Sequence, residues 1–295
     1  MKTPLFTGAA TAIVTPFRDG EIDFEAFGRL LELQYAGGVS TIVVCGTTGE
    51  SATLSPEEQE ALVRFAAKKS NRRMKIIAGI GGNDTKKAMH MARRAEASGA
   101  DGLLMVTPYY NKSTQAGLVA HFTYVADRSA LPLILYNIPS RTGVGIEPET
   151  YALLAQHENI NGVKEASGNI AAFARAKALC GEGLSFWSGN DSDTVAMMAL
   201  GAKGVISVAS NIVPDVVSRL CALCAEGNYP AAAALNEEYM DLFHVLFCEV
   251  NPIPIKTAMA LLGRCGGEMR LPLVPMGYAH WKSLTACLAG HGIIM

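Results

Sequence analysis

Short apolar runs recur along the chain at a step of about 30 residues, and helical segments separate them. Most of the runs are too apolar to leave one face in water, which is typical of parallel strands covered by helices on both sides. Eight strand–helix units of this size match the dimensions of a (β/α)8 TIM barrel. The runs cover residues 11–17, 41–50, 75–83, 102–110, 133–143, 160–168, 185–191 and 204–211.

An open doubly wound sheet is the alternative, but it usually has fewer strands and often a glycine-rich first turn, which "TAIVTPF" lacks. The helical segments also have well-defined starts. Ser55, Pro56 and Glu58 form the pattern of a capping box with proline at the first helical position. Asp84 or Thr85 can cap the next helix.

The last part of the chain is predicted to be helical, in "YPAAAALNEEYMDLFHVLF", "PIPIKTAMALLG" and "MGYAHWKSLTACLAG". No flexible linker precedes it. We therefore expect a barrel with the active site over residues 1–227 and a C-terminal helical layer over residues 228–295, packed on the barrel or on another subunit.

Charge and composition exclude several classes of protein. The formal net charge is −2 and no run of Lys or Arg exceeds a pair, which argues against a nucleic-acid binder. No stretch approaches the ~18 apolar residues of a membrane span, and the N-terminus lacks the pattern of a signal peptide. The seven cysteines are scattered, so reduced thiols and a cytoplasmic location are expected. Cys221 and Cys224 form a C-x-x-C late in a helix, where packing explains them better than redox chemistry.

The active site of such a barrel lies at the carboxyl ends of its strands. The side chains found there are mostly hydroxyls, with one amine: Thr47, Thr48, Tyr109, Tyr110, Tyr136, Arg141 and Lys164. If Lys164 points into the barrel, burial should lower its pKa and make its neutral amine a nucleophile for a carbonyl carbon. If Lys164 instead points out among the helices, Glu165 points inward, and the strand pattern alone leaves both orientations open.

Metal and phosphate chemistry are not expected. The six histidines, His90, His121, His157, His244, His280 and His291, are predicted in helical stretches, and no pair of them has zinc-ligand spacing. Asp191 and Asp193 would repel a phosphate near the seventh strand. The sequence indicates no cofactor and a substrate without phosphate.

Six motifs resemble the dihydrodipicolinate synthase family, whose members are Schiff-base lyases of lysine biosynthesis, and the resemblance runs nearly end to end. The motifs are "GTTGES" (46–51), "TPYYN" (107–111), "YNIPSRTG" (136–143), "GVKEASGN" (162–169), "GVISV" (204–208) and "NPIPIK" (251–256). The resemblance implies that pyruvate forms a Schiff base and condenses with aspartate 4-semialdehyde. It also implies a homotetramer built from tight dimers.

The resemblance assigns roles to seven residues. Lys164 would form the Schiff base, and three hydroxyls would relay protons, one of them from a neighbouring subunit: Tyr136, Thr47 and, in trans, Tyr110. Substrate contacts would come from Thr48 for the pyruvate carboxylate, Arg141 for the carboxylate of the aldehyde, and Ile206 for the wall of the pyruvate pocket.

Two other functions remain open from the sequence. One is a related aldolase for another aldehyde or a sugar acid, similar to N-acetylneuraminate lyase, although that enzyme lacks the "SRTG" run that contains Arg141. The other is a non-catalytic pyruvate-binding protein. Lysine-inhibited relatives carry two histidines and a glutamate where this chain has Pro56, Gln59 and Lys87, so feedback inhibition is expected to be weak or absent.

Overall fold

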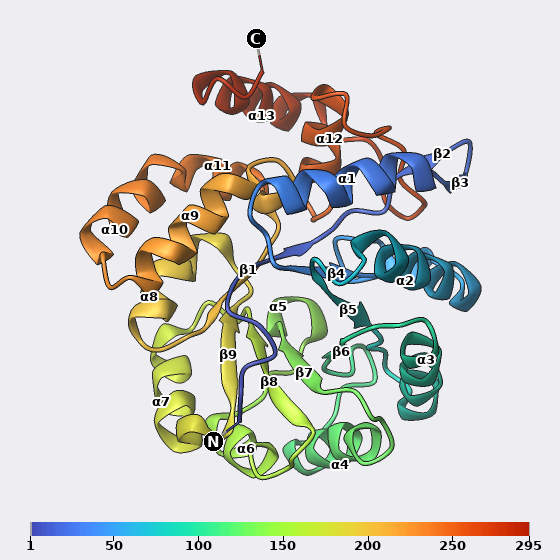
Figure 1. Cartoon of the computed structure of the whole chain (residues 1–295), viewed down its shortest axis with the longest axis vertical. Coiled ribbons are helices and arrows are strands. Elements are labelled where there is room, and N and C mark those ends of the chain that lie inside the picture. The colour runs from blue at the N-terminus through green and yellow to red at the C-terminus, as the bar shows by residue number, and fades with distance from the viewer. Residues whose placement is uncertain (1, 295) are drawn as a thin grey trace.

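The computed structural model describes residues 2–294 and is built around a closed barrel of eight parallel strands (Figure 1). Each strand pairs with the next, and β1 pairs with both β4 and β10, which closes the barrel. The predicted TIM barrel is confirmed. Its strands are β1 (Gly8–Ala12), β4 (Thr41–Val44), β5 (Lys75–Gly79), β6 (Gly102–Val106), β7 (Leu133–Asn137), β8 (Ile160–Glu165), β9 (Ser185–Ser188) and β10 (Gly204–Ser207).

Helices surround the barrel, and Figure 1 shows them outside the strands, except the short α5, which is drawn across the middle of the barrel. They are α1 (Phe24–Ala36), α2 (Pro56–Ser70), α3 (Thr85–Ala97), α4 (Gln115–Ala126), α5 (Pro139–Thr142), α6 (Pro148–Leu154), α7 (Ile170–Cys180), α8 (Thr194–Ala199) and α9 (Pro214–Ala225). Short 3-10 turns are η1 (Ser51–Thr53), η2 (Gly181–Gly183), η3 (Asp191–Asp193) and η4 (Ala209–Asn211). The predicted caps are confirmed: Ser55 and Glu58 form a capping box, and Asp84 caps α3.

The first strand differs from its prediction. The apolar run at 11–17 overlaps β1 only at Thr11 and Ala12, and the buried chain beyond it enters an unpredicted hairpin of β2 (Phe17–Arg18) and β3 (Glu21–Ile22). The turn of this hairpin is Asp19-Gly20, with φ of 54° and 83°, a pair typical of two-residue hairpins. An apolar run indicates burial rather than strand pairing, and here burial continues past the end of the strand.

The strands separate two layers of the core. Tyr136, Trp187 and Ile206 belong to a cluster inside the barrel, whereas their sequence neighbours Leu135 and Phe186 belong to the larger cluster between strands and helices. This alternation follows from the two-residue period of a strand. It decides which side chain at each strand end faces the interior.

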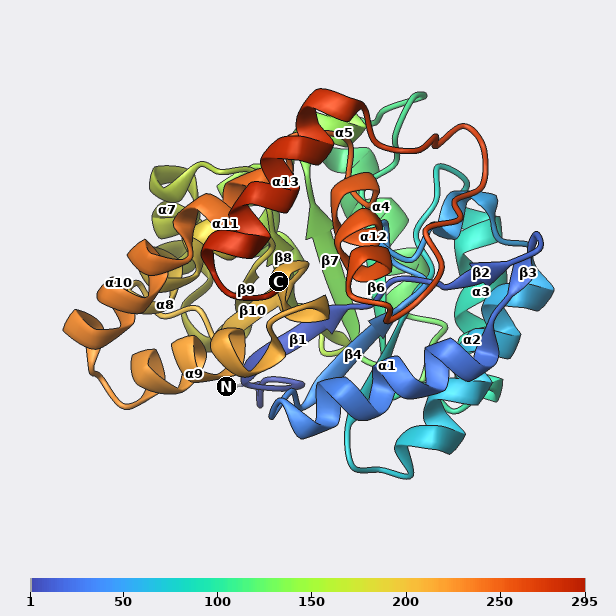
Figure 2. The ribbon, with the colours of Figure 1, turned by 90° about the horizontal axis from the view of Figure 1, so that it is seen from above.

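The C-terminal layer consists of α10 (Tyr229–Glu238), α11 (Met240–Val245), α12 (Ile253–Leu261) and α13 (Tyr278–Gly290). The run at 229–247 is two helices, divided at Tyr239, rather than one uninterrupted segment. Figures 1 and 2 show α13 beside α11 and α12, with which it makes contacts. Leu242 and Leu284 from this layer join the core cluster of the barrel. The domain boundary at residue 227 stays a prediction.

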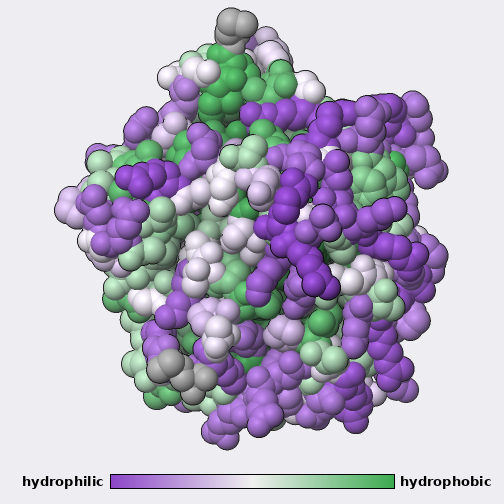
Figure 3. Space-filling view, viewed as in Figure 1, coloured by the Kyte–Doolittle hydropathy of each residue, from purple (hydrophilic) through white to green (hydrophobic). Residues whose placement is uncertain are grey.

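Several large apolar side chains of the C-terminal layer lie at the surface, and Figure 3 shows apolar residues gathered near the C-terminus. Leu271 and Tyr278 are 78% and 68% exposed. Patches of this kind often mark contacts with another protein. Within residues 2–294, no helix is both long enough and apolar enough to span a membrane.

Candidate active site

Lys164 points into the barrel. It aligns with Tyr136 on β7 and with Trp187 on β9, both of which belong to the inner cluster. Its Nζ lies 4.5 Å from the centroid of the Tyr136 ring, and the residue is only 5% exposed. Gly189 packs against it, and a Cβ at that position would lie 2.6 Å from Ala166 Cβ and 3.1 Å from Lys164 Cε. The inward orientation is therefore the correct one of the two left open by the sequence.

Glu165 points the other way and does not neutralise the lysine. Its carboxylate accepts hydrogen bonds from Asn137 Nδ2 at 3.0 and 3.1 Å, from the Tyr151 hydroxyl at 2.7 Å and from the Ser167 backbone N–H at 2.8 Å. These partners satisfy a carboxylate that is only 5% exposed. Lys164 is left without a close counter-ion from its own strand.

The environment of Lys164 increases the fraction of its amine that is neutral. Burial lowers the pKa of Lys164 to about 8, Asp191 opposes this shift, and Arg141 adds to it. A lysine with its ordinary pKa near 10.5 is almost entirely protonated at neutral pH. The lowered pKa supplies a larger fraction of nucleophile.

Asp191, expected to repel a phosphate, also has a structural role that the sequence did not indicate. It lies in η3 after β9, is 3% exposed, and its Oδ2 accepts from the backbone N–H groups of Val208 and Ala209, both at 3.0 Å. Burial raises its pKa. The Asp191 carboxylate thus accepts hydrogen bonds from the backbone N–H groups after β10, the region that binds phosphate in many TIM barrels.

Tyr136 is held as a protonated phenol. It is 7% exposed, and burial raises its pKa to about 12, while Arg141 and the Thr47 hydroxyl oppose the shift. A phenol with this pKa can donate a proton next to Lys164. Thr47, Tyr136 and Lys164 therefore form one group, as the sequence predicted for the strand ends.

Thr48 and Arg141 are joined through a residue that sequence reasoning did not select. Asn251 donates from Nδ2 to Thr48 Oγ1 at 3.0 Å, and Arg141 Nη2 donates to the Asn251 carbonyl at 3.0 Å. Thr48 is 2% exposed and Asn251 is 6% exposed. The sequence contains one sign of this role, because Asn251 is the first residue of the "NPIPIK" motif. Only the fold brings Asn251 to the strand ends.

A pocket of about 480 Å³ opens above this group. Thr47, Arg141 and Asn251 line it, together with Asn83 and Tyr109. Lys164 and Tyr136 do not line it, since both are more deeply buried. Tyr110 is not brought to the group within one chain, and its side chain is 91% exposed.

Two further predictions can be compared with the structure. A second cavity of about 500 Å³ is lined by Cys221 and Cys224, but it contains none of the predicted catalytic residues, and burial raises the pKa of both thiols. The prediction that every histidine lies in a helix is wrong for His157, which lies in the turn between α6 and β8, and for His291, which follows α13. None of the six histidines lies at the carboxyl end of a strand.

The chain matches the Dihydrodipicolinate synthetase family over residues 5–290. It is 48% identical over 290 residues to the 4-hydroxy-tetrahydrodipicolinate synthase of Alkaliphilus oremlandii, covering 98% of this chain and 100% of the relative. The crystal structure of dihydrodipicolinate synthase from Aquifex aeolicus is 47% identical, with a TM-score of 0.95 and coverage of 98% and 99%. The Acinetobacter baumannii dihydrodipicolinate synthase complexed with pyruvate is 40% identical, with a TM-score of 0.96 and coverage of 98% and 100%.

Proposed function

The chain belongs to the dihydrodipicolinate synthetase family, and on that premise we propose that Lys164 is the Schiff-base residue of its reaction. The enzyme is a lyase that forms a carbon–carbon bond between pyruvate and L-aspartate 4-semialdehyde. The product, 4-hydroxy-tetrahydrodipicolinate, leads to diaminopimelate and lysine. The observation that carries the assignment is the inward orientation of Lys164 against Tyr136, with an Nζ-to-ring distance of 4.5 Å.

The reaction begins with attack of the neutral Lys164 amine on the ketone carbon of pyruvate. Tyr136 donates a proton to the oxygen that leaves as water, and an iminium forms. The iminium withdraws electrons, so a methyl proton is lost and an enamine results. The enamine carbon attacks the aldehyde, and the amine of the second substrate then displaces Lys164 and closes the ring.

Thr48 and Arg141 bind the carboxylates of the two substrates. Because Asn251 donates to Thr48 Oγ1, the Thr48 hydroxyl proton is free to point at the carboxylate of pyruvate. Arg141, held by the Asn251 carbonyl, presents its remaining N–H groups to the carboxylate of the aldehyde. Ile206, fully buried in the inner cluster, supplies apolar wall for pyruvate.

The Schiff base is tested by borohydride reduction in the presence of pyruvate, followed by peptide mass mapping. We expect the peptide that contains Lys164 to gain a pyruvyl group, and Lys164→Ala to gain none there. Lys256 is the internal control, because it is also fully buried but is paired with Glu50 at 2.5 Å. Labelling confined to other lysines would contradict the assignment.

We also propose that Tyr110 completes the proton relay of a neighbouring subunit in a homotetramer. Its 91% exposure and the exposed Leu271 and Tyr278 support an association of chains. Coexpressed Tyr110→Phe and Lys164→Ala chains test this, because a mixed dimer restores one site with both groups intact. Activity no higher than the sum of the two separate variants would argue that Tyr110 does not act in trans.

All seven cysteines are free thiols, and this composition supports a cytoplasmic enzyme, which we propose.

A further inference from the structure

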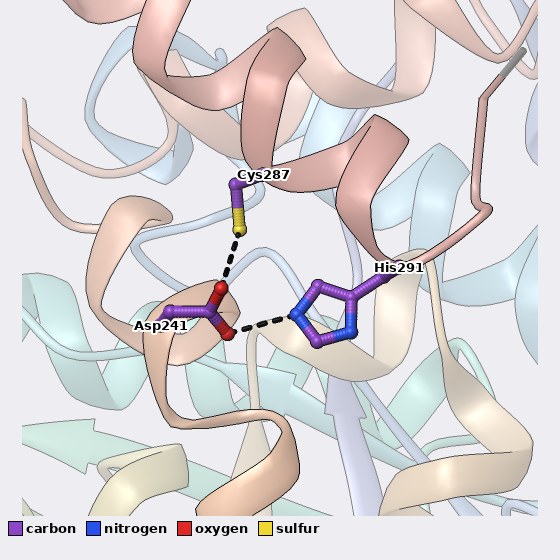
Figure 4. A group of neighbouring side chains, drawn as sticks. All are labelled: Asp241, Cys287 and His291. Atoms are coloured by element: carbon purple, nitrogen blue, oxygen red, sulfur yellow. Dashed lines mark hydrogen bonds and ion pairs between the residues drawn. The ribbon is translucent and has the colours of Figure 1, made fainter.

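Three side chains that commonly bind metals meet between α11 and α13 (Figure 4). Asp241 lies in the first turn of α11, Cys287 in the last turn of α13, and His291 directly follows α13. His291 Nε2 lies 2.8 Å from Asp241 Oδ1, and Cys287 Sγ lies 3.6 Å from Asp241 Oδ2. One carboxylate therefore faces both a thiol and an imidazole.

The spacing of the three donor atoms is close to that of a tetrahedral zinc site. All three lie within 4.8 Å of one another, and no other group of three His, Cys, Asp or Glu side chains in residues 2–294 does so. Zinc bond lengths place neighbouring donors roughly 3.4–3.6 Å apart. The thiol and Asp241 Oδ2 already have this separation, whereas His291 Nε2 lies 2.8 Å from Asp241 Oδ1, so the ring has to move away from that oxygen to bind the ion.

The local structure holds the donors in position. Cys287 and His291 are four residues apart, which places them on the same side of the helix end. The ring of Tyr239 stacks on His291 with centroids 4.8 Å apart and fixes its plane. The His291 side chain is 11% exposed and that of Asp241 is 67% exposed, so the cluster has a sheltered side and an open side.

We propose that Asp241, Cys287 and His291 bind a thiophilic divalent cation, best matched by zinc, with water in the fourth position. A thiolate and an imidazole select zinc over calcium and magnesium, which prefer oxygen ligands. On binding, the Cys287 thiol releases its proton to solvent. The imidazole keeps one proton, on Nδ1, and Nε2 becomes the ligand.

A bound cation would link α11 to the end of α13 in the C-terminal layer. None of the three residues lines the pocket that contains Thr47 and Arg141, so the cation is separate from catalysis. Because a ligand that binds only the folded state stabilises it, zinc should raise the melting temperature and leave turnover unchanged. The sequence alone does not indicate this site, because Asp241 lies 46 residues before Cys287 in the chain.

Cobalt is the probe for this site, because a thiolate bound to Co²⁺ absorbs in the near ultraviolet. The protein is treated with a chelator, dialysed and titrated with CoCl₂. We expect absorption that saturates at one equivalent per chain in the wild type and in Cys248→Ser, a control cysteine of similar partial burial. Cys287→Ser should lose the band, and Asp241→Asn should need several-fold more Co²⁺ to reach saturation.

Thermal unfolding with and without ZnCl₂ gives a second measurement. The melting temperature of the wild type and of Cys248→Ser should rise with zinc, whereas that of Cys287→Ser should not. Normal turnover of Cys287→Ser would show that this variant is folded. If Cys287→Ser does not fold, His291→Gln replaces it in both measurements. Absence of the cobalt band in the wild type, or its survival in a folded Cys287→Ser or His291→Gln, would overturn the proposal.

Discussion

Lys256 Nζ lies 2.5 Å from Glu50 Oε1, and the side chains of both residues are almost completely buried. Lys256 also donates to the Glu268 carbonyl at 2.6 Å, and Glu50 Oε2 accepts from the Arg270 backbone N–H at 3.1 Å. Glu50 has the left-handed φ of 56° and directly follows the loop that carries Thr47 and Thr48. The ion pair ties this loop to α12.

Replacing Lys256 by methionine should destabilise the protein, because Glu50 would remain as a buried carboxylate without its partner. Breaking such a pair from one side costs about 3–5 kcal/mol. We expect a clear fall in melting temperature, partly restored in Lys256→Met with Glu50→Gln. Arg29→Met, which breaks an exposed pair with Glu25, is the control and should change stability by about 0–1 kcal/mol. Equal melting temperatures for Lys256→Met and Arg29→Met would refute a structural role for the buried pair.

Asn251→Ala should weaken pyruvate binding, since it removes the donor that orients the Thr48 hydroxyl. The loss of one buried hydrogen bond, about 1 kcal/mol, corresponds to a rise in KM for pyruvate of roughly 5- to 10-fold. Steady-state kinetics with the concentrations of both substrates varied measure this change in KM for pyruvate. A change in kcat alone, with KM for pyruvate unaltered, would mean that Asn251 does not act through Thr48.

Tyr136→Phe should lower kcat by roughly two orders of magnitude or more, the usual effect of losing a positioned acid or base. The ring remains in the barrel, so packing around Lys164 is preserved. Tyr109→Phe is the control, because Tyr109 is 40% exposed and lines the pocket of about 480 Å³ rather than the buried group around Lys164. A near-normal rate for Tyr136→Phe would remove this phenol from the proton transfers.

The pH dependence of kcat/KM for pyruvate should follow the free Lys164 amine. Its pKa of about 8 means that acid protonates the nucleophile, so activity falls below that pH and levels off above it. The charge of Asp191 raises this pKa, so Asp191→Asn should move the acid limb to lower pH. Asp193→Asn, the control two residues away, should leave the profile in place. An unshifted limb in Asp191→Asn would show that the carboxylate does not act on Lys164.

L-Lysine should inhibit the enzyme weakly. Lys87 and Gln59 line the pocket of about 480 Å³ that Asn83 and Tyr109 also line. A cation at Lys87 repels the ammonium groups of lysine. Initial rates over a titration with L-lysine measure the inhibition. The charge reversal Lys87→Glu should increase it, whereas inhibition of the wild type at micromolar lysine would contradict the prediction.

The succession of eight strands and their helices follows from local patterns. Apolar runs indicate buried segments, and residues such as Ser55 and Asp84 mark where helices begin, because capping involves only neighbours in the chain. The same patterns place Thr47, Tyr136 and Lys164 near strand ends, and the motifs around them indicate the chemistry. Local patterns failed at β1, since burial there extends beyond the strand.

The sequence by itself determined the barrel and the chemical type of its active site. The tertiary structure decided the direction of Lys164, because only the register of β7, β8 and β9 fixes which face of the strand is interior. It also brought Asn251 to Thr48, and Asp241 to His291, across 203 and 50 residues of chain. Such contacts depend on how distant elements pack, and no local periodicity encodes them.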